Sequence, residues 1–570
     1  MQIRNLQVIN FRGIKELNWT IDTPVICLIG PGDSTKTTIL DAIDFALSPK
    51  WNIPFDDCDF FEGKKENPIE IIVTVGLLPE EMLKDGKFGL LTRGWSKGNG
   101  IHDEPAENDE TVLSIKLHVD ESLEPNWTVI CDRNIVGKPI SSKDREKLNC
   151  SRLSDYVDKH LSWGQGSALL AITENNKDSA APILIEALRQ ARLSANLDGL
   201  QEFINAVGVV KTTAELVGVK FKHELKPALD QKALNIGQSA ISLHDGEIPV
   251  RLLGLGSKRL IALGIQFSCL SAGSCLLIDE FENGLEPHRI RHLIQYLLEK
   301  TDDKSKPFGQ VIMTSHSPVV IQSLTCQNIK IVRSNSGITS ISNVDTDLQG
   351  TLRRIPDSLL GNKVLVCEGK TEMGLCMSFE DYWHKSKSKK SFAYQGVVLV
   401  EGEGDNSPRR ALHLSELGYQ VCLFMDGDKL HELRKILLDV EKSSIKLVHW
   451  NDQCSTESRL LNDIPFESIA GLIDLLGKLH NKNDVLNTII SKLGNDSKII
   501  GKTMEEWLQN HLPESEIRNA IGQAANDNSW FKRIDYGEEL GGFIQSQFGL
   551  MKDTELIKKF AEIETWVYEQ

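Results

Sequence analysis

The sequence predicts an α/β protein of two units, the first interrupted by a helical insertion and the second extended by helices. Strand and helix patterns alternate over about the first ninety residues and return between 238 and 335. Between them, from about 150 to 237, "LIEALRQARL" and "LQEFINAVGVV" carry apolar residues at helical spacing. A second alternation starts near 361, where short apolar runs each end in glycine and acidic residues.

Length and composition indicate a globular protein with more than one core. The chain has 570 residues, of which 25% are charged, and a formal net charge of −16. No apolar stretch approaches the ~18 residues that span a bilayer, and the first residues alternate like a strand, unlike a signal peptide. We therefore expect a cytoplasmic protein with no membrane partner. The acidic charge argues against a wholly basic nucleic-acid-binding surface, but not against a local basic groove.

One stretch of the first unit is close to a phosphate-binding loop. In "VICLIGPGDSTKTTILDAI", Gly30, Lys36 and Thr37 fit the pattern G-x-x-x-x-G-K-[ST]. Thr35 stands where the second glycine is expected, and a β-branched residue is stiffer and bulkier there. The sequence therefore predicts a nucleotide site in which turnover is slow.

Three later motifs favour the nucleotide interpretation. "SCLLIDEFENGLEP" is an apolar strand ending in Asp279 and Glu280, where an acidic residue can hold Mg²⁺ and its neighbour can polarise water. "VIMTSHSP" is a second apolar strand, ending in His316. "LLGLGSKRL" places Gly256 and Ser257 ahead of a helix, whose first amides suit an anion. Each motif alone also fits an ordinary turn or helix start. It is therefore the order of the motifs along the chain that favours a nucleotide site.

That order resembles the ABC-type ATPase heads of the RecF and SMC group. "INFRGIKEL" at 9–17 is similar to their opening strand, and "TTILDAI" at 37–43 to the helix after their phosphate loop. The nucleotide-binding residues that the resemblance implies are Gly30, Gly32, Lys36, Thr37, Thr38, Asp279, Gly256 and Ser257.

The resemblance also implies roles. Lys36 would hold the β- and γ-phosphates of ATP, and Thr37 and Asp279 would contact Mg²⁺. Glu280 would be the general base and His316 the γ-phosphate sensor. Such heads close as dimers around nucleotide, with Ser257 reaching ATP on a second subunit, and Gly254 stands where they usually carry serine. We therefore expect at least a homodimer, held partly by the helices of 150–237.

The second unit carries acidic residues at its predicted strand ends. "VLVCEGKTE" places Glu368 after a strand and Glu372 four residues later, and "LFMDGD" places Asp426 and Asp428 after another. Carboxylates gathered on one sheet edge repel one another unless cations are present. Two Mg²⁺ or Mn²⁺ ions are the natural solution, and such a pair suits phosphodiester cleavage. The structural alternative is that these residues only cap helices and solvate turns.

This acidic set resembles the Toprim fold of topoisomerases, primases and some nucleases. An ABC-type head followed by Toprim is similar to the OLD (overcoming lysogenization defect) nucleases. That family includes the nuclease subunit of the Gabija antiphage system and retron-associated effectors. By this likeness, Ser455 and Glu457 in "CSTESRLL" complete the second metal site, and Lys532 stabilises charge on the transferring phosphate.

The resemblance implies an ATPase domain at 1–355 and a Toprim nuclease domain at 356–570, with a helical insertion at about 466–525. The implied function is ATP-regulated, metal-dependent DNA endonuclease activity by an antiphage effector. A helicase-like protein or a retron nucleic acid would be a second component. Three alternatives stay open: a DNA-repair ATPase of the RecF or SMC kind, a topoisomerase or primase, and a nucleotide-sensing scaffold that needs a partner before it cuts.

Overall fold

The computed structural model describes residues 1–153, 157–163, 200–216, 241–270, 273–302, 309–451, 453–493, 503–509 and 511–569, and isolated positions between 167 and 227. Most of the predicted insertion at 150–237 lies outside the described residues, and its described part includes the helix α5 (Gln201–Leu216). Contacts divide the chain into two compact units. The first comprises Met1–Cys27 and Thr37–Ser315, and the second Leu28–Lys36 and His316–Gln570. The predicted domain boundary at 355 stays a prediction.

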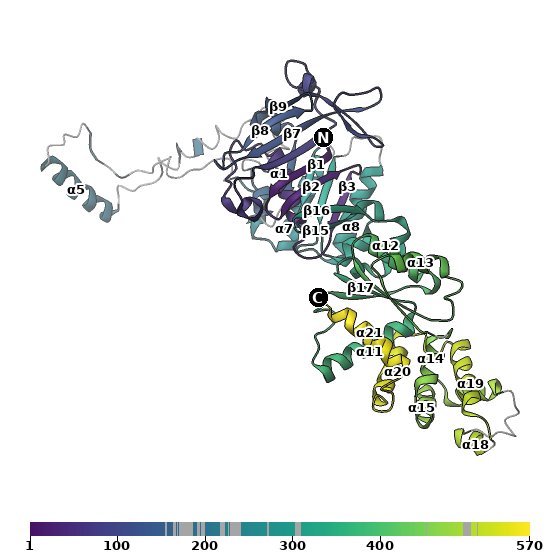
Figure 1. Cartoon of the computed structure of the whole chain (residues 1–570). Helices are drawn as coiled ribbons and strands as arrows, with labels where there is room; N and C mark the ends of the chain where they lie inside the picture. The colour runs from purple at the N-terminus through teal and green to yellow at the C-terminus, as the bar shows by residue number, and fades with distance from the viewer. Residues whose placement is uncertain are drawn as a thin grey trace. The chain divides into compact units, whose positions relative to one another are not determined.

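The first unit begins with antiparallel strands. β1 (Gln2–Phe11) and β2 (Ile14–Thr20) form a hairpin, so the alternating start of the chain is two strands. β1 also pairs with β4 (Ile69–Gly76), which pairs with β7 (Glu110–Val119). The strands beyond β7 are β5 (Arg93–Ser96), β6 (Gly100–His102), β8 (Asn126–Cys131) and β9 (Asn134–Pro139). Figure 1 shows these strands lying side by side.

The same unit contains three parallel strands, two of which are buried along their length. β13 (Cys275–Ile278) lies between β10 (Cys150–Leu153) and β14 (Gln310–Thr314). Every residue of β13 and β14 is buried, as is typical of parallel strands covered on both faces. Asp279 follows β13 directly, so the predicted acidic strand end is confirmed. The helices of this unit besides α5 are α1 (Lys36–Leu47), α2 (Ser142–Glu146), α7 (Leu255–Leu270) and α8 (Pro287–Asp302).

A short hairpin precedes α7. β11 (His244–Asp245) pairs antiparallel with β12 (Ile248–Pro249), and Gly246 between them has φ of 59°. A positive φ at this point favours glycine. Asp-Gly is a typical hairpin turn, and here it joins two short strands.

The second unit contains a four-stranded sheet in the order β18-β17-β19-β20, with all neighbours parallel. Its strands are β17 (Lys363–Cys367), β18 (Val397–Glu401), β19 (Gln420–Met425) and β20 (Lys446–His449). In Figure 1, α12 (Ser407–Glu416) and α13 (Arg434–Lys442) cover one side of the sheet, and α11 (Lys370–Lys387) and α21 (Glu555–Tyr568) lie on the other. The predicted gathering of carboxyl strand ends along one edge is confirmed.

The helices after β20 share one apolar core with this sheet. They are α14 (Thr456–Asp463), α15 (Ile469–Leu479), α16 (Lys482–Lys492), α18 (Met504–Gln509), α19 (Glu514–Asp527), α20 (Ile534–Ser546) and α21. The rings of Phe379 on α11 and Phe560 on α21 stack at 3.6 Å between centroids. α11 and α20 cross so closely that a Cβ on Gly374 would lie 2.3 Å from the Ile534 carbonyl oxygen. Only glycine fits there.

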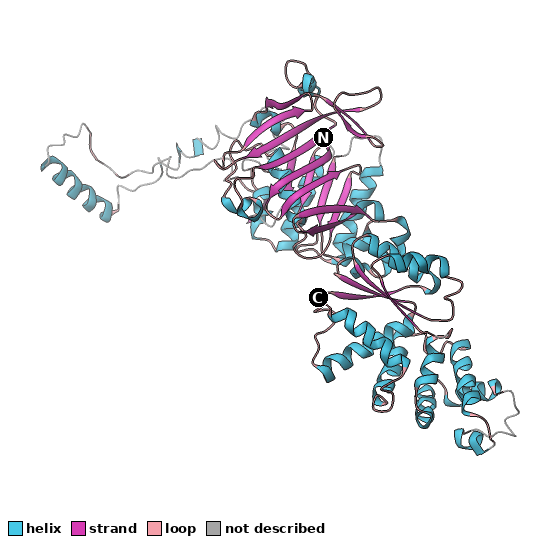
Figure 2. Ribbon diagram, viewed as in Figure 1, coloured by secondary structure: helices cyan, strands magenta, loops and turns pink. Residues whose placement is uncertain are grey.

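The second unit also contains a hairpin of β15 (Ile329–Asn335) and β16 (Ile338–Asn343), and the helices α9 (Pro318–Ser323) and α10 (Gln349–Arg354). β3 (Val25–Ile29), a fully buried apolar strand, leads into the phosphate loop. Figure 2 shows how strands dominate the early part of the chain and helices the late part. Among the described helices, none has the length and apolar character needed to cross a membrane.

Candidate functional site

Residues of the phosphate loop form hydrogen bonds with one another. Gly30 has φ of 154°, and a Cβ there would lie 2.4 Å from the Val332 carbonyl oxygen, so only glycine fits against β15. The Lys36 ammonium is buried and donates to the carbonyl oxygens of Gly30 and Pro31 at 3.1 and 2.8 Å. It also donates to the Ser34 hydroxyl at 3.0 Å. A phosphate that binds Lys36 must compete with these neutral acceptors, and its negative charge favours the exchange.

Thr35 occupies a backbone conformation that suits glycine. Its φ is 65°, and Asp33 two residues earlier has φ of 57°. A positive φ is a rare conformation for a β-branched residue. The predicted misfit of Thr35 is therefore visible in the backbone itself. Gly32 is exposed on the same loop, and Thr38 is half-buried in the first turn of α1.

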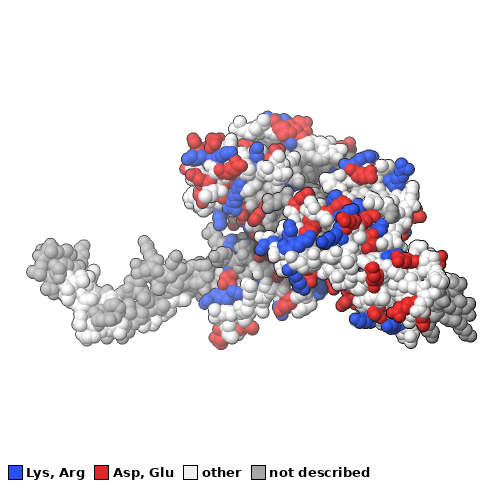
Figure 3. All heavy atoms as spheres, turned by 60° about the horizontal axis from the view of Figure 1, so that its bottom comes forward, with Lys and Arg blue, Asp and Glu red and all other residues white. Residues whose placement is uncertain are grey.

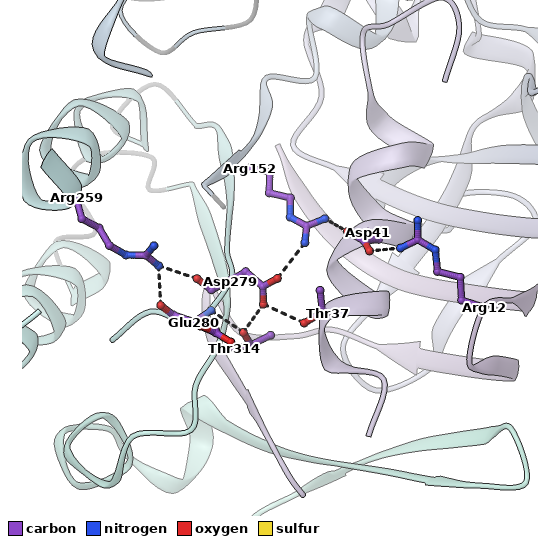
Figure 4. A network of polar contacts seen from close by, with 8 residues as sticks. All are labelled: Arg12, Thr37, Asp41, Arg152, Arg259, Asp279, Glu280 and Thr314. Atoms are coloured by element: carbon purple, nitrogen blue, oxygen red, sulfur yellow. Dashed lines mark hydrogen bonds and ion pairs between the residues drawn. The ribbon is translucent and has the colours of Figure 1, made fainter. Parts of the chain in front are cut away.

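The Asp279 carboxylate is the centre of a polar network in the first unit (Figure 4). Its Oδ1 accepts hydrogen bonds from Thr314 Oγ1 at 2.7 Å and Thr37 Oγ1 at 3.2 Å. Its Oδ2 pairs with Arg152 Nη2 at 3.1 Å. Thr37 and Asp279, the two residues expected at Mg²⁺, are therefore brought together across 242 residues of sequence.

Glu280 is held in an unusual turn next to Asp279. Its φ is 46°, and its amide donates to Thr314 Oγ1 at 2.9 Å. The fully buried Arg259 of α7 donates from Nη2 to the carbonyl oxygens of Asp279 and Glu280 at 2.7 and 2.6 Å. These bonds hold the turn, and the Glu280 side chain stays exposed to solvent.

The remaining nucleotide residues lie at helix starts. Gly256 and Ser257 are not ahead of the helix as expected, because α7 already begins at Leu255. They lie in its first turn, where backbone amides have no partners within the helix, so the anion-binding geometry is retained. A Cβ on Gly256 would lie 2.6 Å from the Gly284 carbonyl oxygen, which explains the glycine. Ser257 is exposed, as is His316, which lies two residues before α9.

The second unit gathers the predicted acidic residues at the carboxyl edge of its sheet. Glu368 follows β17 and Asp426 follows β19, and these strands are neighbours. Glu372 lies in the first turn of α11 and Glu457 in the first turn of α14. Asp428 is exposed, whereas Glu372 and Glu457 are buried.

Hydrogen bonds fix the orientation of three of these carboxylates. Glu368 Oε2 accepts from the Asp426 amide at 2.7 Å. Asp426 Oδ1 accepts from the amide and the hydroxyl of Thr456 at 2.8 and 2.6 Å. Glu372 Oε2 accepts from the Gly369 amide at 2.9 Å and so caps its own helix.

The pKa values of this set show that its charges lie close together. Burial, with the charges of Glu372, Glu368 and Glu457, raises the pKa of Asp426 to about 9. Burial and the Glu457 charge raise the pKa of Glu372 to about 7. Burial also raises the pKa of Glu368, to which Asp428 contributes. Without a cation, the cluster therefore retains protons at neutral pH.

These residues fit a divalent cation in their chemistry. Carboxylate oxygens are the ligands that Mg²⁺ and Mn²⁺ prefer, and buried carboxylates that repel one another are stabilised by positive charge. Within the part of the chain that the structure describes, no group of three or more acidic, His or Cys side chains is already arranged to hold a metal. Side-chain rotation away from the helix cap and the amides would be needed for direct coordination.

Two predicted residues lie beside the cluster rather than within it. Ser455 is the N-cap of α14, and its hydroxyl accepts from the Ser458 amide at 3.3 Å. Lys532 is exposed. The Thr371 hydroxyl, next to Glu372, donates to the Phe531 carbonyl oxygen at 3.1 Å, which ties the segment before Lys532 to the start of α11.

Sequence reasoning missed several residues that hold the sites together. Thr456 anchors Asp426, and it lies within the stretch quoted for Ser455 and Glu457, so its hydroxyl was a readable signal. Arg152 and Thr314 also contact Asp279. Thr314 lies within "VIMTSHSP", two residues before His316, whereas Arg152 belongs to none of the motifs.

Family models match both parts of the first unit. Residues 1–138 match an "AAA ATPase domain". Residues 219–322 match a family described as "AAA domain, putative AbiEii toxin, Type IV TA system". The phosphate loop lies in the first match and Asp279 in the second, so an ATP-binding ATPase domain is shown.

A curated relative matches more than half of the chain. An OLD nuclease from Thermus scotoductus is 25% identical over 364 residues, which is 58% of this chain. The chain is similar to an OLD nuclease over more than half of its length. The match covers 62% of the relative's length. It therefore does not assign the relative's activity, substrates or partners to this chain.

Solved structures of SMC heads also match this chain. An SMC head bound to the C-winged helix domain of ScpA is 14% identical with a TM-score of 0.36, covering 61% of this chain and all of that one. The SMC head domain from Thermotoga maritima is 15% identical with a TM-score of 0.29, covering 60% and all of that chain. Likeness at this level adds no detail, so the ABC-type classification and the Toprim identity stay predictions.

Proposed function

We propose that this protein is an ATP-regulated, divalent-metal-dependent endonuclease that cuts DNA phosphodiester bonds at its acidic sheet edge. One observation carries the proposal. Glu368, Glu372 and Glu457 lie close enough to Asp426, at the carboxyl edge of a parallel sheet, for their charges to raise its pKa. Such sheets bind ligands at that edge. An ATPase domain in the same chain and an OLD nuclease among its relatives support the assignment.

The proposed chemistry follows from the charges. Glu368, Asp426 and Asp428 would hold one divalent ion, and Glu372 and Glu457, with Ser455, a second. Bound divalent cations supply a nucleophilic water and stabilise charge on the phosphate. Lys532 would stabilise the charge on the phosphate as well. It directly follows Phe531, whose carbonyl oxygen accepts a hydrogen bond from Thr371 at the start of α11. Thr456 keeps Asp426 turned toward the edge by donating two hydrogen bonds to its Oδ1.

DNA would be held by local basic groups. The face in Figure 3 shows Lys and Arg interspersed with Asp and Glu rather than gathered in one large patch. A net charge of −16 then favours short-range contacts at the cleavage edge over long-range attraction of DNA. Binding of this kind is selective for DNA that reaches the metal site.

We further propose a homodimer or higher homo-oligomer that acts in antiphage defence, with a helicase-like protein or a retron nucleic acid as a second component. ATP would act more as a switch than as fuel, because Thr35 strains the phosphate loop. Nucleotide state in the ATPase domain would then set when DNA is cut.

The test is a cleavage assay on supercoiled and linear DNA with Mg²⁺ or Mn²⁺, with and without ATP. Metal-dependent cutting that changes with ATP is the expected result. No cutting with either metal in any nucleotide state would contradict the proposal.

A nucleotide-sensing scaffold that needs a partner before it cuts is the second candidate. The favouring observation is that the acidic side chains in the described residues do not form a ready metal site. Cleavage that starts only on addition of a partner would distinguish it.

A further inference from the structure

Arg152 lies between two carboxylates of the nucleotide region (Figure 4). Its Nη1 pairs with Asp41 Oδ1 on α1, and its Nη2 pairs with Asp279 Oδ2 at 3.1 Å. All three side chains are largely shielded from solvent, with 14%, 14% and 16% of their surface exposed. The sequence motifs give Arg152 no role.

The strand that carries Arg152 explains its reach. β10 is parallel to β13, and Arg152 is in register with Leu277, two residues before Asp279. The Asp279 amide donates to the Leu153 carbonyl oxygen at 3.1 Å, so the two strand ends are fixed to each other. The Arg152 guanidinium therefore approaches Asp279 from a rigid neighbouring strand.

Asp41 holds the guanidinium from the other side. It lies on α1 four residues after Thr37, and so on the same helix face. Arg12 Nη1 pairs with Asp41 Oδ2, and Arg12 Nε pairs with Asp59 at 2.7 Å. Negative and positive side chains thus alternate in the order Asp59, Arg12, Asp41, Arg152 and Asp279.

This arrangement leaves Asp279 little freedom. Oδ1 is engaged by Thr314 and Thr37, and Oδ2 by Arg152. Arg152 is the charged member of this set, and its planar fork can bridge two carboxylates at fixed angles. Its Nε is buried and has no hydrogen-bond partner among the described residues.

We propose that Arg152 is a positioning residue of the nucleotide site, which aims the Asp279 carboxylate at the metal that accompanies ATP while Asp41 holds the guanidinium in place. The proposal rests on the ATP-binding function proposed above. Without the guanidinium, Asp41 and Asp279 would repel each other, and Asp279 would turn away from Thr37.

The test measures ATP affinity of the full chain by calorimetry, once in EDTA and once with saturating MgCl₂. Wild type should bind ATP more tightly with Mg²⁺. In Arg152→Met, affinity in EDTA should stay within about twofold, because Lys36 and the loop amides are untouched. The enhancement by Mg²⁺ should fall at least about tenfold, since one metal contact is no longer aimed.

Further variants separate positioning from general stability. Arg152→Lys keeps the charge but cannot bridge both carboxylates, so it should recover only part of the Mg²⁺ enhancement. Asp41→Asn should reduce the enhancement as well. The double variant should be no worse than Arg152→Met by more than about twofold, because Asp41 acts through Arg152.

Arg93→Met is the matched control. The Arg93 side chain is also 14% exposed and pairs with Asp132 at 2.9 Å, on β5 and away from the nucleotide residues. It should alter the melting temperature without changing the Mg²⁺ enhancement. An unchanged Mg²⁺ enhancement in Arg152→Met, or wild-type ATP binding that Mg²⁺ does not enhance, would overturn the proposal. Absence of ATP binding by wild type in both conditions would instead refute the ATP-binding function.

Discussion

The Thr35 hydroxyl lies 3.3 Å from the Thr339 hydroxyl of β16 and donates to the Ser34 carbonyl oxygen at 2.6 Å. These contacts hold a β-branched residue at a backbone φ of 65° inside the phosphate loop. Residues kept in such conformations by their surroundings cost of order 1–3 kcal/mol. The loop is therefore strained where a glycine would relax it.

Replacing Thr35 with glycine should raise ATP hydrolysis. Glycine adopts the observed φ without strain and lets phosphate approach the backbone closely. We expect an increase of roughly fivefold or more, the ratio that corresponds to about 1 kcal/mol. Phosphate release by wild type and Thr35→Gly is the measurement, with Lys36→Ala as the blank. Brisk wild-type hydrolysis that the glycine does not increase would show that threonine is simply tolerated.

Asp426→Asn should abolish DNA cleavage while leaving the fold intact. With its pKa raised to about 9, Asp426 is mostly protonated in the metal-free protein at neutral pH, and asparagine is its neutral isostere. We expect cleavage to fall by at least about 10²–10³, with the free energy of unfolding changed by less than about 1 kcal/mol. Plasmid cleavage and denaturant unfolding test the two parts. Cleavage retained by Asp426→Asn and also by Asp426→Ala would remove this residue from the site.

Acid should destabilise the first unit through His160. Burial lowers the pKa of His160 to about 4. Its neutral ring accepts from Gln266 Nε2 at Nδ1 and donates from Nε2 to the Arg152 carbonyl oxygen. Between pH 6.5 and 4 the unfolded chain binds the proton that the folded chain excludes, so stability falls as pH falls.

The expected loss from His160 between pH 6.5 and 5 is up to about 2 kcal/mol, at 1.36 kcal/mol per pH unit. Urea unfolding across this range measures it in wild type and in His160→Gln. The variant is expected to be less stable at pH 7, and its free energy of unfolding is expected to change less with pH. Parallel curves for the two proteins would show that another group causes the loss.

Mixing two inactive variants should restore ATP hydrolysis if the site is shared between subunits. Ser257 is exposed in the first turn of α7, as a residue that reaches a neighbouring subunit must be. Lys36→Ala and Ser257→Ala should each be inactive alone. Random exchange into a symmetric dimer should give about a quarter of wild-type activity, because half the dimers carry one intact site of two. Light scattering should show at least a dimer, and a monomer with and without ATP would contradict this prediction.

The positions of Glu368 and Asp426 were predictable because each follows a short apolar run. Such runs become buried parallel strands, and parallel strands bring their carboxyl ends to one edge. Asp279 was predictable in the same way after β13. In each case local sequence determines the position of the side chain along a strand.

The contacts that hold these residues in place were not predictable from the sequence. Arg152 contacts Asp41 and Asp279 across 111 and 127 residues of sequence, and nothing in the local pattern of "NCSRLS" indicates it. The start of α7 at Leu255 rather than after Ser257 is a shift of the size at which helix ends are usually uncertain. Such contacts depend on tertiary packing, which single motifs do not encode.

The close crossing of α11 and α20 at Gly374 has a consequence for the order of synthesis. Glu372 lies two residues before Gly374 on α11, yet α20 and α21 follow Glu457, the last acidic member of the cluster, in the chain. A ribosome therefore releases every member of the acidic cluster before it releases α20, against which α11 packs. While the chain is still nascent, α11 lacks the surface against which it packs, and the acidic edge stays unassembled. If this edge cuts DNA as proposed, cutting would have to wait until α20 and α21 have left the ribosome.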